Sequence, residues 1–303
     1  MGYMHIANLY RPEAQHVLLF KEVFALEKIH GTSTHIEFRP SDNSIRYFSG
    51  GTKHESFVKL FNETELIEKF KALSLPVDRN ITVFGEGYGG KEQGMRDTYG
   101  PDLKFIAFDV KIGERWLSVQ DAEKIVLDLG LEFIFYKKVS TSYTEENGVR
   151  KYVELDGERD ATSAQALRNG VEGYRKREGI VIRPIAEMTL NNGDRVMAKH
   201  KRDEFRETAK PREILIDPSK LEVLSNAQAV ANEWVTNERM NHVLSKIPDH
   251  NISKIPVIIK SMLEDVLREG AGEIVDSKEV RSAISKKTVD NYKAMLNASI
   301  GKA

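Results

Sequence analysis

Short runs of alternating apolar and polar residues dominate the first two thirds of the chain. Bounded by glycine, proline and polar turns, such runs predict β-strands, because successive side chains of a strand point to opposite faces of a sheet. The expected strands cover residues 35–38, 44–48, 81–84, 104–110, 131–136, 179–184 and 195–201. Residues 62–73 and 119–130 instead carry apolar residues at helical spacing and predict two helices between the strands. The polar stretch 140–160 is expected to be a surface loop or hairpin.

The pattern becomes helical towards the end of the chain. Residues 220–235, 253–270 and 276–300 carry a helical period, and Asp276 with Glu279 resembles an N-terminal helix cap. Pro211 and Pro218 lie in the preceding segment, as in a linker. We therefore predict an α+β domain of antiparallel sheets and helices over residues 1–208 and a smaller, all-helical domain over residues 209–303.

Composition narrows the function classes. The 303 residues carry a formal net charge of −1, which argues against nucleic-acid binding by bulk electrostatics and leaves a local basic cleft open. The chain has no cysteine, which excludes disulfides, thiolate metal sites and cysteine nucleophiles. No basic leader and no long apolar window is present. We expect a cytoplasmic monomer without membrane contact; a phage-encoded protein would act in the host cytoplasm.

The glycine-rich stretch GEGYGG, residues 85–90, matches the dinucleotide fingerprint G-x-G-x-x-G. That fingerprint needs a helix that opens at the glycines, whereas two more glycines and a proline follow here. The more informative residue is Glu86, an acid between two glycines at a strand end, where a ligand can approach the backbone closely.

Five separate segments each place a charged or aromatic residue at the end of an apolar strand. They are EKIHGTS with Lys28, VFGEG with Glu86, FIAFDV with Phe108 and Asp109, EGIVIRP with Glu178 and Arg183, and VMAKHK with Lys199 and Lys201. Taken singly, each has a plainer interpretation. An aromatic such as Phe108 is usually core, a glutamate beside arginines usually forms a surface ion pair, and alternate lysines usually form a solvated strand face.

Together, the five segments resemble, in order and approximate spacing, the motifs of the covalent nucleotidyltransferases. This superfamily holds polynucleotide ligases and mRNA capping enzymes. EKIHGT is most similar to the nucleophile motif of the RNA ligases typified by the second RNA ligase of T-even phages, because His30 stands where DNA ligases and capping enzymes usually have aspartate. The resemblance covers Glu27 to about Phe205 and implies a nucleotidyltransferase domain of the ATP-grasp-like ligase adenylation type.

The resemblance implies that Lys28 attacks the α-phosphate of ATP. A lysine with its ordinary pKa of about 10.4 is protonated at neutral pH and is not a nucleophile. We expect partial burial and the neighbouring cations Lys199 and Lys201 to lower that pKa, and the same two cations to neutralise the phosphates. AMP would then pass from Lys28 to a 5′-phosphate, and a 3′-hydroxyl would displace it to seal the strand.

The other motif residues receive roles by the same resemblance. Glu86 would bind the ribose hydroxyls, Phe108 would stack on adenine, and Glu178 would hold Mg²⁺ or Mn²⁺. Glu27 and Thr32 would lie near adenine, while His30 and Gly31 shape the turn. Asp109 would give hydrogen-bonding support, and Arg183 would contact phosphate or substrate.

Two departures and several alternatives stay open. The family usually has an arginine, a small residue and glycine after the first motif; here Phe48 or Ser49 is near that place, and Arg46 is the candidate for its role. Arg183 replaces a lysine and presents a planar fork. The expected partner is a nicked duplex with RNA on the 3′-hydroxyl side. A DNA ligase, an mRNA capping guanylyltransferase and a noncatalytic nucleotide- or RNA-binding module are the alternatives.

Overall fold

The computed structural model describes residues 2–73, 78–146, 149–190, 193–205 and 227–300, apart from the side chains of residues 228, 279 and 297–300. The chain forms two compact units, Met1–Arg202 and Asp203–Ala303. The expected domain boundary between residues 208 and 209 lies outside the described residues, so it stays a prediction. No helix in the described part of the chain is both long enough and apolar enough to cross a membrane.

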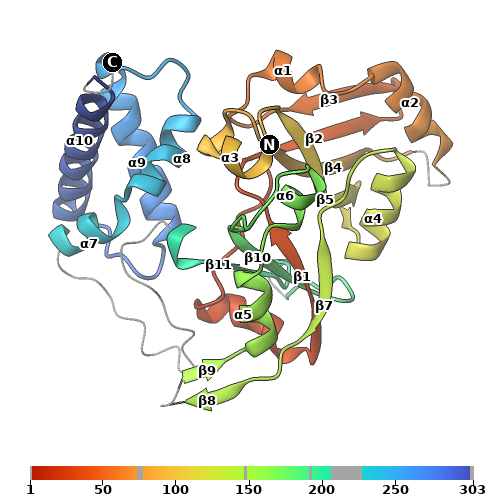
Figure 1. Ribbon diagram of the computed structural model, residues 1–303, viewed down its shortest axis with the longest axis horizontal. Helices are drawn as coiled ribbons and strands as arrows, with labels where there is room; N and C mark the ends of the chain where they lie inside the picture. Colours follow the sequence, from red (N-terminus) through yellow and green to blue (C-terminus); the bar gives the residue numbers. More distant parts are fainter. Residues whose placement is uncertain (1, 74–77, 147–148, 191–192, 206–226, 301–303) are drawn as a thin grey trace. The chain divides into compact units, whose positions relative to one another are not determined.

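The first unit contains two antiparallel sheets (Figure 1). One has the strand order β11-β10-β1-β7 and the other the order β3-β2-β4-β5-β6. The strands of the first sheet are β1 (Glu22–Lys28), β7 (Tyr136–Ser140), β10 (Gly179–Pro184) and β11 (Ala198–Lys201). The strands of the second are β2 (Thr32–Arg39), β3 (Ser44–Phe48), β4 (Ile81–Tyr88), β5 (Lys104–Ile112) and β6 (Arg115–Trp116). A separate hairpin pairs β8 (Thr144–Glu146) with β9 (Val149–Lys151).

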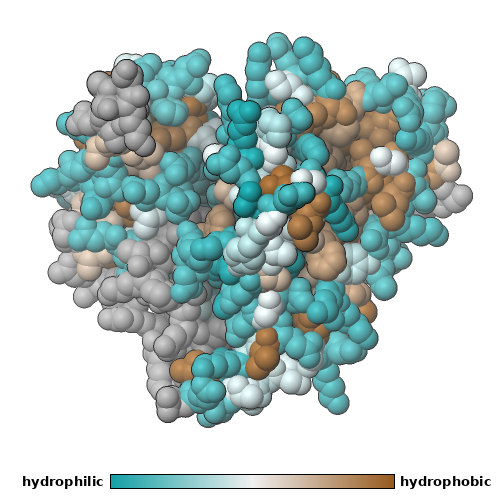
Figure 2. Space-filling model, viewed as in Figure 1, coloured by the Kyte–Doolittle hydropathy of each residue, from teal (hydrophilic) through white to brown (hydrophobic). Residues whose placement is uncertain are grey.

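The first unit has six α-helices in its described part, and polar side chains cap the N-termini of three of them, α2, α4 and α6. The six helices are α1 (His54–Val58), α2 (Glu63–Ala72), α3 (Arg96–Tyr99), α4 (Val119–Asp128), α5 (Val153–Asp160) and α6 (Ala164–Arg168). A 3-10 helix covers Pro12–Leu19, and a shorter one covers Glu92–Gly94. Ser118 accepts a hydrogen bond from the Asp121 amide at the start of α4, which Figure 1 shows beside β5. In Figure 2 apolar atoms gather over the region of β2 to β5 and their helices.

The register assigns side chains to the two faces of each sheet. In the first sheet, Leu26 is opposite Val181, and Val181 is opposite Lys199, so these three side chains share one face. Because Phe24 and Leu26 belong to the same core cluster as residues of the second sheet, this face packs towards it. The lysines at the strand ends therefore share the face that contacts the core.

A buried ionic network centres on Asp109, which is fully buried. Its carboxylate accepts from Arg183 at 3.1 Å, from Arg195 at 2.6 Å and from the Tyr3 hydroxyl at 2.6 Å. Glu187 accepts from both arginines, at 2.6 Å in each case. Since Asp109 lies on β5 and Arg183 on β10, the network joins the two sheets.

The second unit is helical in its described part. Its helices are α7 (Ala227–Trp234), α8 (Asn237–Ser245), α9 (Ile255–Glu269) and α10 (Lys278–Ile300), with 3-10 helices at Asp203–Phe205 and Ile252–Lys254. Trp234, Met262 and Tyr292 are buried in its core. The predicted organisation, antiparallel α+β followed by C-terminal helices, is confirmed.

Three local predictions need correction. Residues 131–135 are not a strand; Ile134 donates to the Ala107 carbonyl, and the strand begins at Tyr136. The stretch 140–160 contains the predicted hairpin, β8 with β9, but its last part, residues 153–160, is helix α5. The cap at α10 is Ser277, whose hydroxyl accepts from the Val280 amide, while Asp276 pairs with Arg281.

We expect Asp109→Asn to lower the free energy of unfolding by about 3–5 kcal/mol, because it leaves two buried arginines with only one of their two shared carboxylates. Urea unfolding at neutral pH measures the change. The control is Glu114→Gln, which removes the carboxylate that pairs with Lys111. Because the Glu114 side chain is 94% exposed, this substitution should change the free energy of unfolding little. Equal effects of the two substitutions would contradict a structural role for the network.

Candidate active site

Three adjacent strand ends create the centre of the site. Lys28, the last residue of β1, is opposite Gly179, and Gly179 is opposite Lys201 on β11. A side chain at position 179 would not fit, because a Cβ there would lie 2.2 Å from the His200 carbonyl oxygen. The glycine therefore lets β11 approach closely enough to place Lys201 beside Lys28.

The two lysines meet at Glu178, whose carboxylate is 1% exposed. Lys28 Nζ lies 2.9 Å from one carboxylate oxygen and Lys201 Nζ lies 2.8 Å from the other, while His30 Nδ1 is 3.2 Å from the first. Burial by itself would raise the pKa of Glu178, but Lys201, Lys28 and His30 together lower that pKa well below its usual range. Glu178 is thus a buried, ionised acid shared by two cations.

The turn after Lys28 is packed against β4. A Cβ at Gly31 would lie 2.4 Å from the Gly87 carbonyl oxygen and 2.9 Å from Cγ of Glu86, so only glycine fits there. The His30 amide donates to the Tyr99 hydroxyl at 3.3 Å. These contacts fix the loop that carries His30 to Glu178.

Glu86 lies across this loop from the lysines. The pKa of Glu86 is raised to about 8, chiefly by burial and also by the charge of Glu178, although Lys28, the Gly31 amide and Lys201 oppose the shift. Near neutral pH its carboxyl group is therefore largely protonated and able to donate a hydrogen bond as well as accept one.

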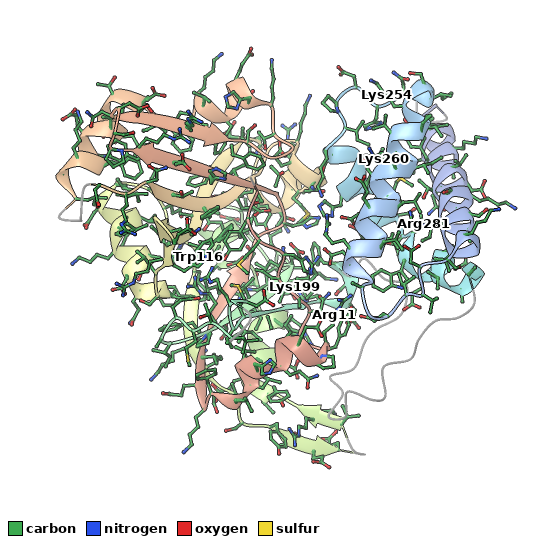
Figure 3. All side chains as sticks on the ribbon, turned by 180° about the vertical axis from the view of Figure 1, so that it is seen from behind. Arg11, Trp116, Lys199, Lys254, Lys260 and Arg281 are labelled. Atoms are coloured by element: carbon green, nitrogen blue, oxygen red, sulfur yellow. The ribbon has the colours of Figure 1, made fainter. Side chains whose placement is uncertain are left out.

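Phe108 lies at an irregularity in the pairing between β4 and β5. The register between β4 and β5 shifts at Phe84 and Gly85, pairing Phe84 with Asp109 and Gly85 with Ala107, so Phe108 has no partner on β4. Its partly buried ring packs against the core and meets Tyr3 edge-on, with ring centroids 4.9 Å apart. Lys199, labelled in Figure 3, lies two residues from Lys201 on the same face of β11.

Comparisons with known proteins identify the family of the chain. The family model described as RNA ligase matches residues 21–201. The chain belongs to the RNA ligase family. A comparison with curated protein sequences gives no match.

Two solved structures of the Naegleria gruberi RNA ligase resemble this family member. One is a lysine-to-alanine variant with ATP and Mn, at 15% identity, TM-score 0.50 and coverage of 68% of this chain and 57% of that chain. The other is an aspartate-to-alanine variant in its apo form, at 15% identity, TM-score 0.50 and coverage of 68% and 56%. At this identity the likeness establishes the fold, and the match spans less than three fifths of the Naegleria chain.

Some of the predicted site residues of this RNA ligase family member lie in other environments. Arg183 is 2% exposed and donates to the Leu117 carbonyl at 2.8 Å in addition to Asp109 and Glu187. Arg46 is an exposed residue of β3, opposite Glu37. Their predicted phosphate contacts stay predictions; in the structure, the guanidinium of Arg183 serves the ionic network.

Two further predicted residues support the surrounding backbone. The carboxylate of Glu27 is buried and accepts from Ser163 Oγ at 2.5 Å and from the Ala164 amide at 2.9 Å. Burial raises the pKa of Glu27, although Arg177 opposes the shift. Thr32 Oγ1 accepts from the Gly51 amide at 2.9 Å, which holds the loop after β3. Their predicted proximity to adenine stays a prediction.

Sequence reasoning missed residues that connect the strands of the site to neighbouring elements. Nε2 of His200 lies 2.8 Å from Asp156 and 3.0 Å from Arg159, which ties β11 to α5. Arg195 reaches Asp109 and lies 4.2 Å from the ring of Trp116, also labelled in Figure 3. His200 stands between two motif lysines, which is the one local signal that could have drawn attention to it.

We expect the raised pKa of Glu86 to appear as a pH dependence of stability. Between pH 4.5, its ordinary pKa, and about pH 8, the folded state keeps a proton that the unfolded state has lost, so the unfolding free energy falls as pH rises. Glu86→Gln should flatten this fall. Urea unfolding at intervals from pH 5 to 8 measures the slope. Glu37→Gln, on the neighbouring strand β2, is the control and should keep the wild-type slope; equal slopes for wild type and Glu86→Gln would contradict the assignment.

Proposed function

We propose that the chain is an ATP-dependent RNA ligase that joins 5′-phosphate and 3′-hydroxyl ends through a lysyl-AMP intermediate. The observation that carries the proposal is the buried Glu178 between Lys28 and Lys201, at the strand ends of a chain that belongs to the RNA ligase family. A nucleophile of this class needs a defined position and cationic neighbours, and this cluster supplies both.

In the first step, Nζ of Lys28 releases a proton to solvent water, and the resulting amine attacks the α-phosphorus of ATP. A P–N bond forms as the bond from the α-phosphorus to the bridging oxygen breaks, and pyrophosphate leaves with that electron pair. Lys201 and Lys199, on the same face of β11, are placed to offset the negative charge on the departing phosphates.

The nucleotide is held by residues on both sheets. Glu86 would bind the ribose hydroxyls, for which a protonated carboxyl group supplies both a donor and an acceptor. Phe108, left without a partner on β4 by the register shift, would stack on adenine, a contact worth about 1–3 kcal/mol. Val181, partly exposed on the same sheet face as Lys199, is an apolar candidate for the opposite side of the base.

A divalent cation fits this site only as an ion shared with the nucleotide. The described residues contain no cluster of three or more histidine, aspartate or glutamate side chains able to hold a metal alone. Glu178 offers one ionised carboxylate, and Mg²⁺ commonly binds through one or two carboxylates together with substrate phosphates and water. Mg²⁺ or Mn²⁺ bound there would withdraw electron density from the attacked phosphoryl group.

The later steps use the same residues. The 5′-phosphate of a polynucleotide attacks the phosphorus of lysyl-AMP, and the P–N bond breaks to return Lys28 to its amine form. A 3′-hydroxyl then attacks the activated 5′-phosphate, and AMP leaves as the phosphodiester forms. The cations at positions 199 and 201 are placed to stabilise charge in each transfer.

The finer assignment is to the branch typified by the second RNA ligase of T-even phages, with a nucleotidyltransferase domain over residues 1–208. His30, which contacts Glu178, supports this branch, because aspartate usually stands there in DNA ligases and capping enzymes. The helices of residues 227–300 also favour it over enzymes that append a barrel of short strands. A nicked duplex with RNA on the 3′-hydroxyl side is the corresponding substrate.

Incubation with Mg²⁺ and ATP labelled at the α-phosphate should give a covalent protein–AMP adduct. Lys28→Ala should abolish the adduct because it removes the attacking nitrogen. The matched control is Lys111→Ala, since the Lys111 side chain is also 24% exposed and also pairs with a glutamate. Denaturing electrophoresis detects the label. Wild-type protein that gains no label over a range of metals and pH would contradict an enzyme and favour a binding module, and labelling by GTP would favour capping.

Sealing of nicked duplexes tests the substrate. We expect nicks with RNA at the 3′-hydroxyl side to be sealed at least about tenfold faster than all-DNA nicks, because the 2′-hydroxyl distinguishes the two sugars. Rates of product formation on gels give the comparison. Equal rates on both duplexes would assign the chain to a ligase without RNA preference.

A further inference from the structure

An exposed tyrosine stands on the segment that leads into Glu178. Tyr174 is 57% exposed, although large aromatic side chains are usually buried in part by the core. Its hydroxyl accepts from both terminal nitrogens of Arg202 at 2.8 Å and donates to the Asp160 carbonyl at 3.3 Å. The hydroxyl end of the ring is therefore anchored while much of the side chain stays open to solvent.

The backbone next to Tyr174 is also anchored. The Arg175 carbonyl accepts from the Ser163 amide at 2.7 Å and from Thr162 Oγ1 at 3.1 Å, and the Arg175 amide donates to the same hydroxyl at 3.2 Å. Two nitrogens of Arg177 donate to the Thr162 carbonyl. The tyrosine thus stands on a segment clamped to the junction between α5 and α6, which keeps the cost of ordering it on binding low.

Two cationic residues follow Tyr174 in the chain, and a third, Arg202, contacts its hydroxyl. Arg175 donates only to the carbonyls of Asp97 and Tyr174 and has no carboxylate partner in the described part of the chain. Lys176 is exposed beside it. Arg202 is partly offset by Asp160, at 3.5 Å. An aromatic platform with adjacent arginine and lysine is the combination that holds a single nucleic-acid strand, by base stacking and phosphate contact.

The platform is connected directly to the proposed catalytic cluster. The Arg202 amide donates to the Glu178 carbonyl at 2.9 Å, and Arg202 follows Lys201 in the chain. Tyr174 lies four positions before Glu178 in the chain, which limits the distance between their Cα atoms to about 14 Å. A nucleotide on the ring would therefore lie within a few nucleotides of the phosphate that reacts at Lys28.

We propose that Tyr174, with Arg175 and Lys176, is a strand-binding platform on which one base of the RNA substrate stacks near the reacting phosphate. This inference rests on the proposed ligase function and adds a substrate contact outside its nucleotide site. The ring binds the base, and the two cations bind the adjoining phosphates.

Removal of the ring tests the platform. Tyr174→Ala should raise the KM for a nicked RNA duplex about 5- to 150-fold, the range expected for a lost base stack. It should leave the rate of protein–AMP formation, which needs only ATP, within about twofold of wild type. Tyr174→Phe keeps the ring and should stay within about threefold of wild type in KM.

The matched control is Tyr143→Ala. Tyr143 is 46% exposed, also has an arginine against its ring at 4.3 Å, and adjoins the β8–β9 hairpin at the end of the unit opposite β2 and β3 (Figure 1). Its loss should leave the KM for RNA unchanged. An equal rise in KM in both alanine variants, or a rise in the KM for ATP in Tyr174→Ala, would overturn the platform.

Direct observation of stacking uses 2-aminopurine, whose fluorescence falls when it stacks. The base is placed singly at each of the three positions on either side of the nick, and binding is measured with Lys28→Ala so that no turnover occurs. At one position, binding of the Lys28→Ala variant should quench the fluorescence of 2-aminopurine. The double variant Lys28→Ala/Tyr174→Ala should not quench it. Quenching that is unaffected by the second substitution would overturn the proposal.

The contribution of Arg175 and Lys176 can be measured separately, from the salt dependence of RNA binding. Arg175→Gln and Lys176→Gln should each reduce the slope of log affinity against log salt by about 0.7–0.9. Failure of the wild type to form any AMP adduct would defeat the ligase assignment itself. Normal adduct formation and sealing with an unchanged KM in Tyr174→Ala would defeat the platform alone.

Discussion

A buried carboxylate must be paired, and much of the first unit is arranged around one such requirement. Glu178 is almost completely removed from solvent, where an isolated charge would be costly. Lys28 and Lys201 compensate it from the two strands that flank β10. The carboxylate therefore stabilises the relative position of three strands and also holds Lys28, the proposed nucleophile, close to a second cation. Stability and the proposed chemistry depend on the same two ion pairs.

A second buried network sets the spacing of the sheets. Asp109 on β5 and Arg183 on β10 face each other, and Arg195, Glu187 and Tyr3 complete the pairing. Phe108 directly precedes Asp109 at the register shift between β4 and β5. The network that joins the sheets therefore also fixes the backbone from which the Phe108 side chain projects. The ion network therefore holds the two sheets together, and through Asp109 it also orients the neighbouring Phe108 side chain.

The local parts of this arrangement could be predicted from sequence, and the nonlocal parts could not. The apolar runs before Lys28 and Lys201 indicate the two strand ends, since such a run is a property of neighbouring residues. That β1 lies between β7 and β10 is not encoded in any window, and only the family resemblance indicated that these lysines meet. The pairing of Asp109 with Arg195 and Tyr3 has no local signal at all. Residues 131–135 misled the strand prediction because an apolar run in the core need not form a strand.

The position of β1 within its sheet has a consequence for the order in which the molecule assembles. The strand that ends in Lys28 has β7 on one side and β10 on the other, and both follow it by more than a hundred residues of chain. Contacts of such sequence separation form slowly, since the intervening loop must close first. During synthesis on the ribosome, an apolar strand would emerge with both edges unpaired, a state that invites aggregation. The strand that carries the proposed nucleophile is thus made before both of its neighbours and pairs with them only after the intervening chain has been synthesised.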